Sequence, residues 1–192
     1  MRKCQAMRTI VTKTPLKDLL LIHVDYFQDE RGFLIESWHK KDFEKEGINL
    51  SFVLEIHSQS KPGVIRGLHY QDQTAPMAKV IRCIVGSTYV VAVDIRSTSE
   101  TFGKWFSTNL TEENKKQIYI PVGFAVGFAV LGNKNAELLY KVTNFYTPSA
   151  EKVLLWNDKK LAIDWPFNDP IVSERDKKGT LFTAYEKNPS FI

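Results

Sequence analysis

Apolar residues along the chain occur in short runs rich in Val, Ile, Tyr and Phe, separated by Gly, Pro, Asn, Asp or Ser. Sustained helical periodicity is hard to find, so the pattern is typical of a chain built mainly from β-strands. The clearest run, residues 79–96, has two β-branched stretches that meet at Gly86-Ser87, which predicts a β-hairpin there. Further strands are predicted at 51–58, 117–132, 136–146 and 152–157.

Helical segments are few and short in this pattern. Residues 40–47 predict a short helix closed by Gly47, and residues 110–116 predict one helical turn that Thr111 can cap. Neither segment is long enough to form a helical layer. Many short strands at fairly regular spacing indicate a sandwich or barrel such as a jelly roll. We therefore expect an all-β fold with short peripheral helices.

The length of 192 residues allows a sizeable core and favours one domain over two. We expect a single domain over 1–192, with an N-terminal extension at 1–15 and a C-terminal tail at 177–192. From residue 158 onward the chain is richer in Pro, Asp and Lys, which indicates an irregular cover over a sheet.

Charge and cysteine content narrow the class of protein. The formal net charge is +4, with basic and acidic residues interspersed, so a nucleic-acid partner is not expected, whereas a small anionic ligand is. The two cysteines, Cys4 and Cys83, indicate neither a disulfide framework nor a thiolate metal cluster, which fits a reducing cytoplasm. We expect no signal peptide and no membrane partner, because the apolar runs are short.

Four histidines occur, and one of them stands out by its surroundings. His39 lies in a charged segment typical of the surface, while His23 and His57 lie in strand-like runs where a hydrogen-bonded structural role is expected. His69 follows Arg66 and precedes Gln71 in the run GVIRGLHYQ. On an alternating strand, positions 67, 69 and 71 share a face, with Gly67 leaving room beside the other two, which suits a ligand.

The chemistry around His69 favours a general base. A metal site would require further histidines, and none follows His69, so we expect no metal. Nucleophilic catalysis is not indicated, because there is no Gly-x-Ser-x-Gly motif and Cys83 has no recognisable partner. A lone histidine base needs a carboxylate to fix its tautomer, and several carboxylates remain candidates at this point.

Seven motifs resemble, in order and spacing, those of the dTDP-4-dehydrorhamnose 3,5-epimerases of the rhamnose pathway. The likeness covers about residues 20 to 180, and the motifs are DERGFLIES, GVIRGLHYQ, AKVIRCIVGSTYVVAVDIR, SETFGKW, IPVGFAVGF, WNDKKLAIDWP and SERD. The resemblance implies a cupin-type double-stranded β-helix and a homodimer that needs no cofactor. It also implies epimerisation of a nucleotide-diphosphate-linked 4-keto-6-deoxyhexose at C3 and C5.

By the same resemblance, four residues are catalytic. His69 is the base and Asp176 the carboxylate that orients it, Lys79 stabilises the enolate, and Tyr140 is the acid on the opposite face of the sugar. Removal of a proton next to a ketone requires this combination of a base, a stabilised enolate oxygen and an acid.

Five further residues are implied in substrate binding. Arg31 and Arg66 are expected to hold the pyrophosphate, and the residues expected to line the nucleotide-sugar pocket are Glu36, Gln71 and Tyr146.

The chain departs from the family pattern at four positions expected in the pocket. Val126 stands where the family has a histidine that touches the sugar, Leu54 and Ile56 replace a Gln-x-Asn pair, and Leu34 matches a phenylalanine. All four residues are apolar, and three of the replacements delete hydrogen-bonding groups, so we expect proton abstraction to be retained and the substrate to differ.

Three alternatives remain open from the sequence. The enzyme could invert a single centre of a different nucleotide sugar, linked to CDP or GDP. The protein could instead be a non-catalytic nucleotide-sugar-binding cupin, or a ketoisomerase of the broader cupin group. The apolar, strand-like segment 18–27 could also cover a sheet edge of a second copy in a dimer.

Overall fold

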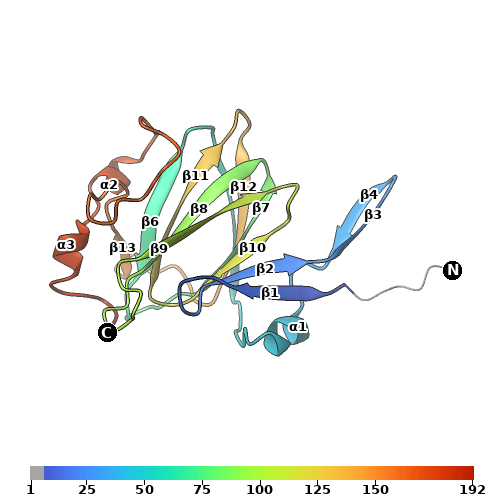
Figure 1. The fold of residues 1–192 in the computed structure, drawn as a ribbon, viewed down its shortest axis with the longest axis horizontal. Helices are drawn as coiled ribbons and strands as arrows, with labels where there is room; N and C mark the ends of the chain where they lie inside the picture. The colour runs from blue at the N-terminus through green and yellow to red at the C-terminus, as the bar shows by residue number, and fades with distance from the viewer. Residues whose placement is uncertain (1–6) are drawn as a thin grey trace.

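The computed structural model describes residues 7–192, which form two facing antiparallel sheets (Figure 1). The first sheet has the spatial order β1 (Thr9–Lys13), β2 (Leu20–Val24), β10 (Gln117–Ile120), β7 (Lys79–Val85), β12 (Ala136–Val142) and β5 (Leu54–Ser60). The second has the order β13 (Glu151–Val153), β6 (Ile65–Gln71), β11 (Phe124–Leu131), β8 (Ser87–Asp94) and β9 (Trp105–Thr111). The predicted all-β jelly roll with short peripheral helices is confirmed.

The main core lies between the two sheets, where alternate residues of each strand meet. Ile81 and Leu138 of the six-stranded sheet face Val90, Ala92 and their neighbours on the five-stranded sheet, and all four are essentially buried. The other residues of the same strands point outward, as the two-residue period of a strand requires.

The outer face of each sheet is covered by a different part of the chain. On the six-stranded sheet, the predicted helix is α1 (Lys40–Lys45), whose Phe43 packs on Ile22 and Val80. On the five-stranded sheet the C-terminal segment forms the cover, and it contains two short helices that the sequence did not predict, α2 (Glu174–Lys177) and α3 (Phe182–Tyr185). This segment places residues 173–176 beside β6.

The prediction of a β-hairpin at Gly86-Ser87 is wrong, because the two strands that meet there do not pair with each other. β7 pairs with β10 and β12, whereas β8 pairs with β9 and β11 in the other sheet. Gly86 therefore carries the chain from one sheet to the other. It does so with φ +74°, and a Cβ there would lie 2.5 Å from the carbonyl oxygen of Asn135, so a side chain would collide with the neighbouring backbone.

At residues 110–116 the predicted cap at Thr111 is confirmed, but the predicted helical turn does not form. The strand β9 continues to Thr111, and a single turn follows. The Thr111 hydroxyl accepts hydrogen bonds from the backbone N–H groups of Glu113 (3.2 Å) and Asn114 (3.0 Å), as in a cap. The turn ends at Lys115, whose φ of 50° is incompatible with a right-handed helix.

The two strands β3 (Tyr26–Asp29) and β4 (Gly32–Ile35) form a separate hairpin that projects away from both sheets (Figure 1). Its large apolar side chains Tyr26, Phe27, Phe33 and Leu34 are exposed. Lys115 lies 3.7 Å from the centre of the Phe33 ring and links the hairpin to the turn after β9.

Two further predictions concern membrane-spanning segments and the cysteines. None of the helices within residues 7–192 has the length and apolar character needed to cross a membrane. Cys83 is buried in β7, and burial raises the pKa of its thiol to about 11, which makes it a poor nucleophile at neutral pH. Cys4 lies outside the described residues.

Candidate active site

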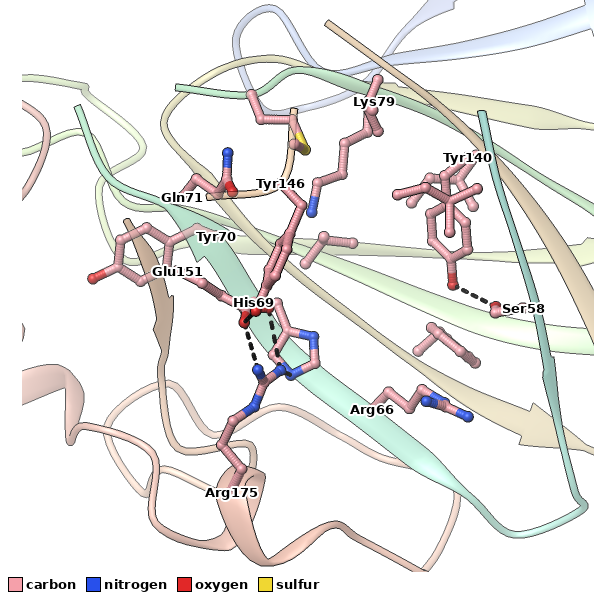
Figure 2. A pocket seen from close by; sticks show the side chains of 16 residues that line it. Ser58, Arg66, His69, Tyr70, Gln71, Lys79, Tyr140, Tyr146, Glu151 and Arg175 are labelled. Carbon is pink, nitrogen blue, oxygen red and sulfur yellow. Dashed lines mark hydrogen bonds and ion pairs between the residues drawn. The ribbon is translucent and has the colours of Figure 1, made fainter. Parts of the chain in front are cut away.

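A pocket opens between the two sheets, and β6, β7, β11 and β12 supply most of its walls (Figure 2). His69, Lys79 and Tyr140 line it, together with Arg66, Gln71 and Tyr146. The structure thus brings six of the nine predicted site residues into one cavity, and Asp176 lies directly behind His69.

A β-bulge explains why Arg66 and His69, three positions apart on β6, face the same cavity. His69 pairs with Val126 of β11, but Arg66 pairs with Phe128, so three steps along β6 oppose two along β11. Gly67 lies inside this irregularity, and a Cβ there would be 2.5 Å from Cα of Gly127. The missing side chain therefore admits the neighbouring strand and not a ligand, which corrects the expectation for Gly67.

His69 and Asp176 form a hydrogen-bonded pair. His69 Nε2 lies 2.7 Å from Asp176 Oδ1, and Asp176 Oδ2 accepts the backbone N–H of Gly67 at 3.2 Å. Burial alone would raise the pKa of Asp176, but the hydrogen bond and charge of His69, with Arg175 nearby, outweigh burial and lower it. An ionised carboxylate only accepts hydrogen bonds, so Nε2 carries the ring proton and Nδ1 keeps a free lone pair.

A cluster of Tyr146, Glu151 and Arg175 lies against the same histidine, and the sequence assigned no role to the last two. Arg175 Nη2 is 3.1 Å from His69 Nε2, a contact between two N–H groups and not a hydrogen bond when Nε2 carries the proton. The guanidinium forms an ion pair with Glu151. The Tyr146 hydroxyl donates to Glu151 at 2.7 Å. Arg175 was within reach of prediction, because it precedes Asp176 in the SERD motif, whereas Glu151 resembles any charged residue of an exposed strand.

Lys79 begins β7 and its ammonium extends into the pocket (Figure 2). Burial lowers the pKa of Lys79 to about 8, partly opposed by the negative charge of Glu151. The group is therefore largely cationic at neutral pH and is poorly solvated, which strengthens its attraction for an oxyanion.

Tyr140 projects from β12, in the opposite sheet from His69. Burial raises the pKa of its hydroxyl to about 12, and the Ser58 hydroxyl donates a hydrogen bond to it at 3.3 Å. The phenol therefore stays protonated at neutral pH, and the Tyr140 side chain lines the same cavity as His69 and Lys79 (Figure 2).

Gln71 and Arg66 are held by bonds to the protein itself. The Gln71 amide donates to the carbonyls of Ala75 (2.7 Å) and Phe145 (3.2 Å) and accepts the N–H of Thr147 (2.7 Å), so it fixes the loop that carries Tyr146. Arg66 donates to the Ser60 hydroxyl and to a backbone carbonyl, which orients its guanidinium along the pocket wall.

Arg31 and Glu36 do not line this pocket. Arg31 is at the tip of the β3–β4 hairpin, where its side chain is 84% exposed and paired with Asp29, and Glu36 is exposed just after β4. Of the four departures from the family pattern, Val126 and Ile56 line the pocket, but Leu54 and Leu34 do not. Leu34 belongs to the projecting hairpin and is 66% exposed, so the expectation that all four lie in the pocket of this chain is wrong.

The other three histidines lie outside the pocket. His57 points to the outer face of the six-stranded sheet, and its Nε2 lies 2.9 Å from Glu137 Oε2, so the predicted hydrogen bond is present. The side chain of His23, on β2, forms no hydrogen bond within residues 7–192, which differs from the prediction. His39 lies at the surface, 3.1 Å from Asp42. Within residues 7–192, no three His, Cys, Asp or Glu side chains are grouped so that they could hold a metal ion.

Comparisons with known proteins agree with this site. A family model described as dTDP-4-dehydrorhamnose 3,5-epimerase matches residues 13–184. A curated protein of that name from Shigella flexneri is 47% identical over 173 residues, which are 90% of this chain and 95% of that protein. Both the length of the match and the identity are high enough to establish common descent of the whole fold.

Two solved structures of 3,5-epimerases superpose well on this chain. That of the enzyme from Elizabethkingia anophelis NUHP1 has a TM-score of 0.88 at 42% identity, and covers 93% of this chain and 99% of that one. The structure of the enzyme from Legionella pneumophila, in complex with dTDP-4-keto-L-rhamnose, has a TM-score of 0.86 at 40% identity. The match covers 93% of this chain and 94% of that one. The chain therefore belongs to the dTDP-4-dehydrorhamnose 3,5-epimerase family.

Proposed function

We propose that this protein inverts C3, C5 or both in a nucleoside-diphosphate-linked 4-keto-6-deoxyhexose, by proton transfer through an enolate. The observation that carries the proposal is the placement of a carboxylate-paired histidine and a protonated tyrosine on opposite sheets, with a buried ammonium in the same cavity. Membership of the family supports it, and the relative from Legionella pneumophila binds a 4-keto nucleotide sugar.

The first step is removal of a proton from the carbon next to the ketone. His69 Nδ1 accepts the proton, and the electron pair of the C–H bond forms the carbon–carbon double bond of an enolate. Asp176 stabilises the imidazolium that results, because it already accepts the Nε2 proton. The negative charge moves to the ketone oxygen, where the Lys79 ammonium balances it.

The second step returns a proton to the opposite face of the same carbon. Tyr140 donates its hydroxyl proton to the carbon while the carbonyl re-forms, and the configuration is inverted. The phenolate that remains accepts the hydrogen bond from Ser58, and exchange with solvent restores Tyr140 and His69 to their starting forms. Arg66 is the cation on this chain that we assign to the pyrophosphate, a role for which a guanidinium is well suited.

We also propose that two copies of the chain form a homodimer through the β3–β4 hairpin. The hairpin projects from the body, exposes Phe27, Phe33 and Leu34, and carries Arg31 at its tip. Exposed apolar groups on a projecting hairpin favour burial against a second copy. We propose that this arrangement takes Arg31 and Glu36 to the pocket of the second copy, where they serve the predicted role.

The proposal is tested by proton NMR in deuterated water with dTDP-4-keto-6-deoxyglucose, in parallel with its CDP and GDP counterparts. We expect deuterium to enter at C3, C5 or both with one of them, and His69→Asn to slow exchange by about 10²–10⁴-fold. His57→Asn is the matched control, because His57 lies on the outer face of its sheet. If His69→Asn exchanged at the rate of the unmodified enzyme, the proposal would be wrong.

The products also separate the alternatives. In the proton spectrum of the product, inversion at one carbon changes the coupling pattern of one ring proton, and inversion at two carbons changes the patterns of both. An isomerase would instead move the carbonyl to another carbon. Binding of all three nucleotides without exchange would leave only the non-catalytic protein.

A further inference from the structure

The inner end of the pocket is apolar. Four side chains form what we call the apolar floor: Ile56, Ile81, Val126 and Phe128. Val126, Phe128 and Ile81 are 7%, 6% and 1% exposed and are part of the core between the sheets, so a group that contacts these three is shielded from water. Ile56 lies outside that core and is 38% exposed.

The floor lies beside the catalytic side chains. Val126 pairs directly across the strands with His69, in β11 and β6. On the opposite sheet, Tyr140 pairs with Ile56 on one side and with Ile81 on the other. Side chains opposite each other in an antiparallel pair lie about 5 Å apart at Cβ. The base and the acid thus each have an apolar side chain beside them, close enough to contact a substituent of the same sugar ring.

The polar groups of the pocket already have partners or roles. Ser58 donates its proton to Tyr140, and the Gln71 amide is bonded to the backbone. Tyr146, Glu151 and Arg175 bond to one another on the far side of His69 from Tyr140 (Figure 2).

The free polar groups are then few. Among the described residues that line the pocket, the polar groups available to the sugar include His69 Nδ1, the Lys79 ammonium, the Tyr140 hydroxyl and the free edge of Arg66. The Ser58 oxygen, which donates to Tyr140, can still accept a hydrogen bond. The four side chains of the floor carry no hydrogen-bonding group, so a ring hydroxyl that points at the floor has no partner there.

The two carbons on which the base and acid act are C3 and C5, on either side of the ketone. In a 4-keto-6-deoxyhexose C5 carries a methyl group, which suits an apolar neighbour, whereas C3 carries a hydroxyl. A buried hydroxyl without a hydrogen bond is unfavourable, and a hydrogen atom in its place is not.

We propose that the preferred substrate is a nucleoside-diphosphate-linked 4-keto-3,6-dideoxyhexose, in which the apolar floor contacts the deoxygenated C3. The inference rests on the proposed function and narrows its substrate. It has a stereochemical consequence, because a carbon with two hydrogens has no configuration to invert, so the productive inversion is at C5.

The test compares three substrates that share one nucleotide, dTDP, and differ only at the ring: the 4-keto-6-deoxy, 4-keto-3,6-dideoxy and 4-keto-2,6-dideoxy sugars. Deuterium entry at C5 is followed by mass spectrometry and NMR, because C5–H is present in all three. We expect kcat/KM for the 3,6-dideoxy sugar to exceed that for the 6-deoxy sugar by on the order of 10- to 100-fold, the effect of one unpaired hydroxyl.

Variants of the floor provide the second measurement. Val126→Thr and Ile56→Asn each offer the C3 hydroxyl a partner, and we expect each to reduce that ratio by roughly tenfold. Met77→Gln is the control, since it adds an amide to a pocket residue outside the floor and should leave the ratio unchanged.

The outcomes are distinct. An equal or higher kcat/KM for the 6-deoxy sugar, or an advantage confined to the 2,6-dideoxy sugar, would overturn the inference and leave the epimerase intact. Absence of C5 exchange with all three would overturn the proposed function, and this inference with it.

Discussion

Lys79 is the residue whose protonation should set the upper pH limit of activity. Its pKa is lowered to about 8, chiefly by burial, so the ammonium loses its charge as the pH rises through that value. Because the enolate oxygen needs a cation, kcat should fall above about pH 8. Arg does not titrate in this range, so Lys79→Arg should abolish that decline, even if its activity is lower throughout. A pH profile of deuterium exchange for both proteins tests this, and an unchanged decline in the variant would assign it to another group.

Tyr140 offers a way to separate proton removal from proton return. Tyr140→Phe keeps the ring in its buried site but removes the acid, while His69 and Asp176 are untouched. We therefore expect deuterium exchange to continue with retained configuration, and inversion to fall by about 10²–10⁴-fold. Time-resolved NMR measures both rates in one sample. Equal losses of exchange and inversion would contradict the assignment of Tyr140 as the acid alone.

At the scale of elements, the bulge between β6 and β11 depends on Gly67. Its φ is +121°, and a Cβ would contact Gly127 Cα at 2.5 Å and the Val126 carbonyl oxygen at 2.8 Å. Gly67→Ala should lower the free energy of unfolding by roughly 1–3 kcal/mol from overpacking alone. Gly132→Ala is the control, because Gly132 also has a positive φ but open space around it. Denaturant unfolding of both variants compares them, and an equal loss would mean that backbone strain alone matters.

The strands could be predicted from the sequence, but their partners could not. Alternation of apolar and polar residues is local, so β5, β7, β8, β11 and β12 all lie within predicted segments or overlap them. A Gly-Ser step between two β-branched runs looks the same whether the chain turns back or crosses to a facing sheet. The difference at Gly86 depends on pairing with β10, β12, β9 and β11, which are distant in sequence.

The active-site residues could likewise be predicted from the sequence only in part. Arg66, His69 and Gln71 share one short motif, and their common direction follows partly from strand alternation and partly from a bulge that has no local signal. Asp176 is 107 residues from His69, and only the family resemblance pointed to it. Arg31 and Glu36 were assigned from that resemblance too, and the structure places them away from this chain's pocket because the β3–β4 hairpin projects outward.

For the whole molecule, the proposed dimer makes the hairpin essential to both assembly and activity. Leu34→Asp places a charge among the exposed apolar side chains of the hairpin without touching the pocket. We expect the unmodified protein to have the mass of a dimer and the variant that of a monomer with a raised KM. Light scattering and steady-state kinetics measure the two effects. Ile192→Asp, at the exposed C-terminal residue, is the control and should remain dimeric. A monomeric unmodified protein would contradict the proposal.

The base and the acid belong to different sheets, His69 to the five-stranded sheet and Tyr140 to the six-stranded one. Facing sheets pack about 10 Å apart, a spacing set by the side chains of the core. The thickness of the space left for the sugar ring is therefore a property of core packing and not of loops. Enlarging a core residue such as Ala92 should widen that space and slow catalysis without any contact with the substrate. An exchange at Ile56, the floor residue outside that core, would instead alter which ring substituents fit while the distance between proton acceptor and proton donor stays the same.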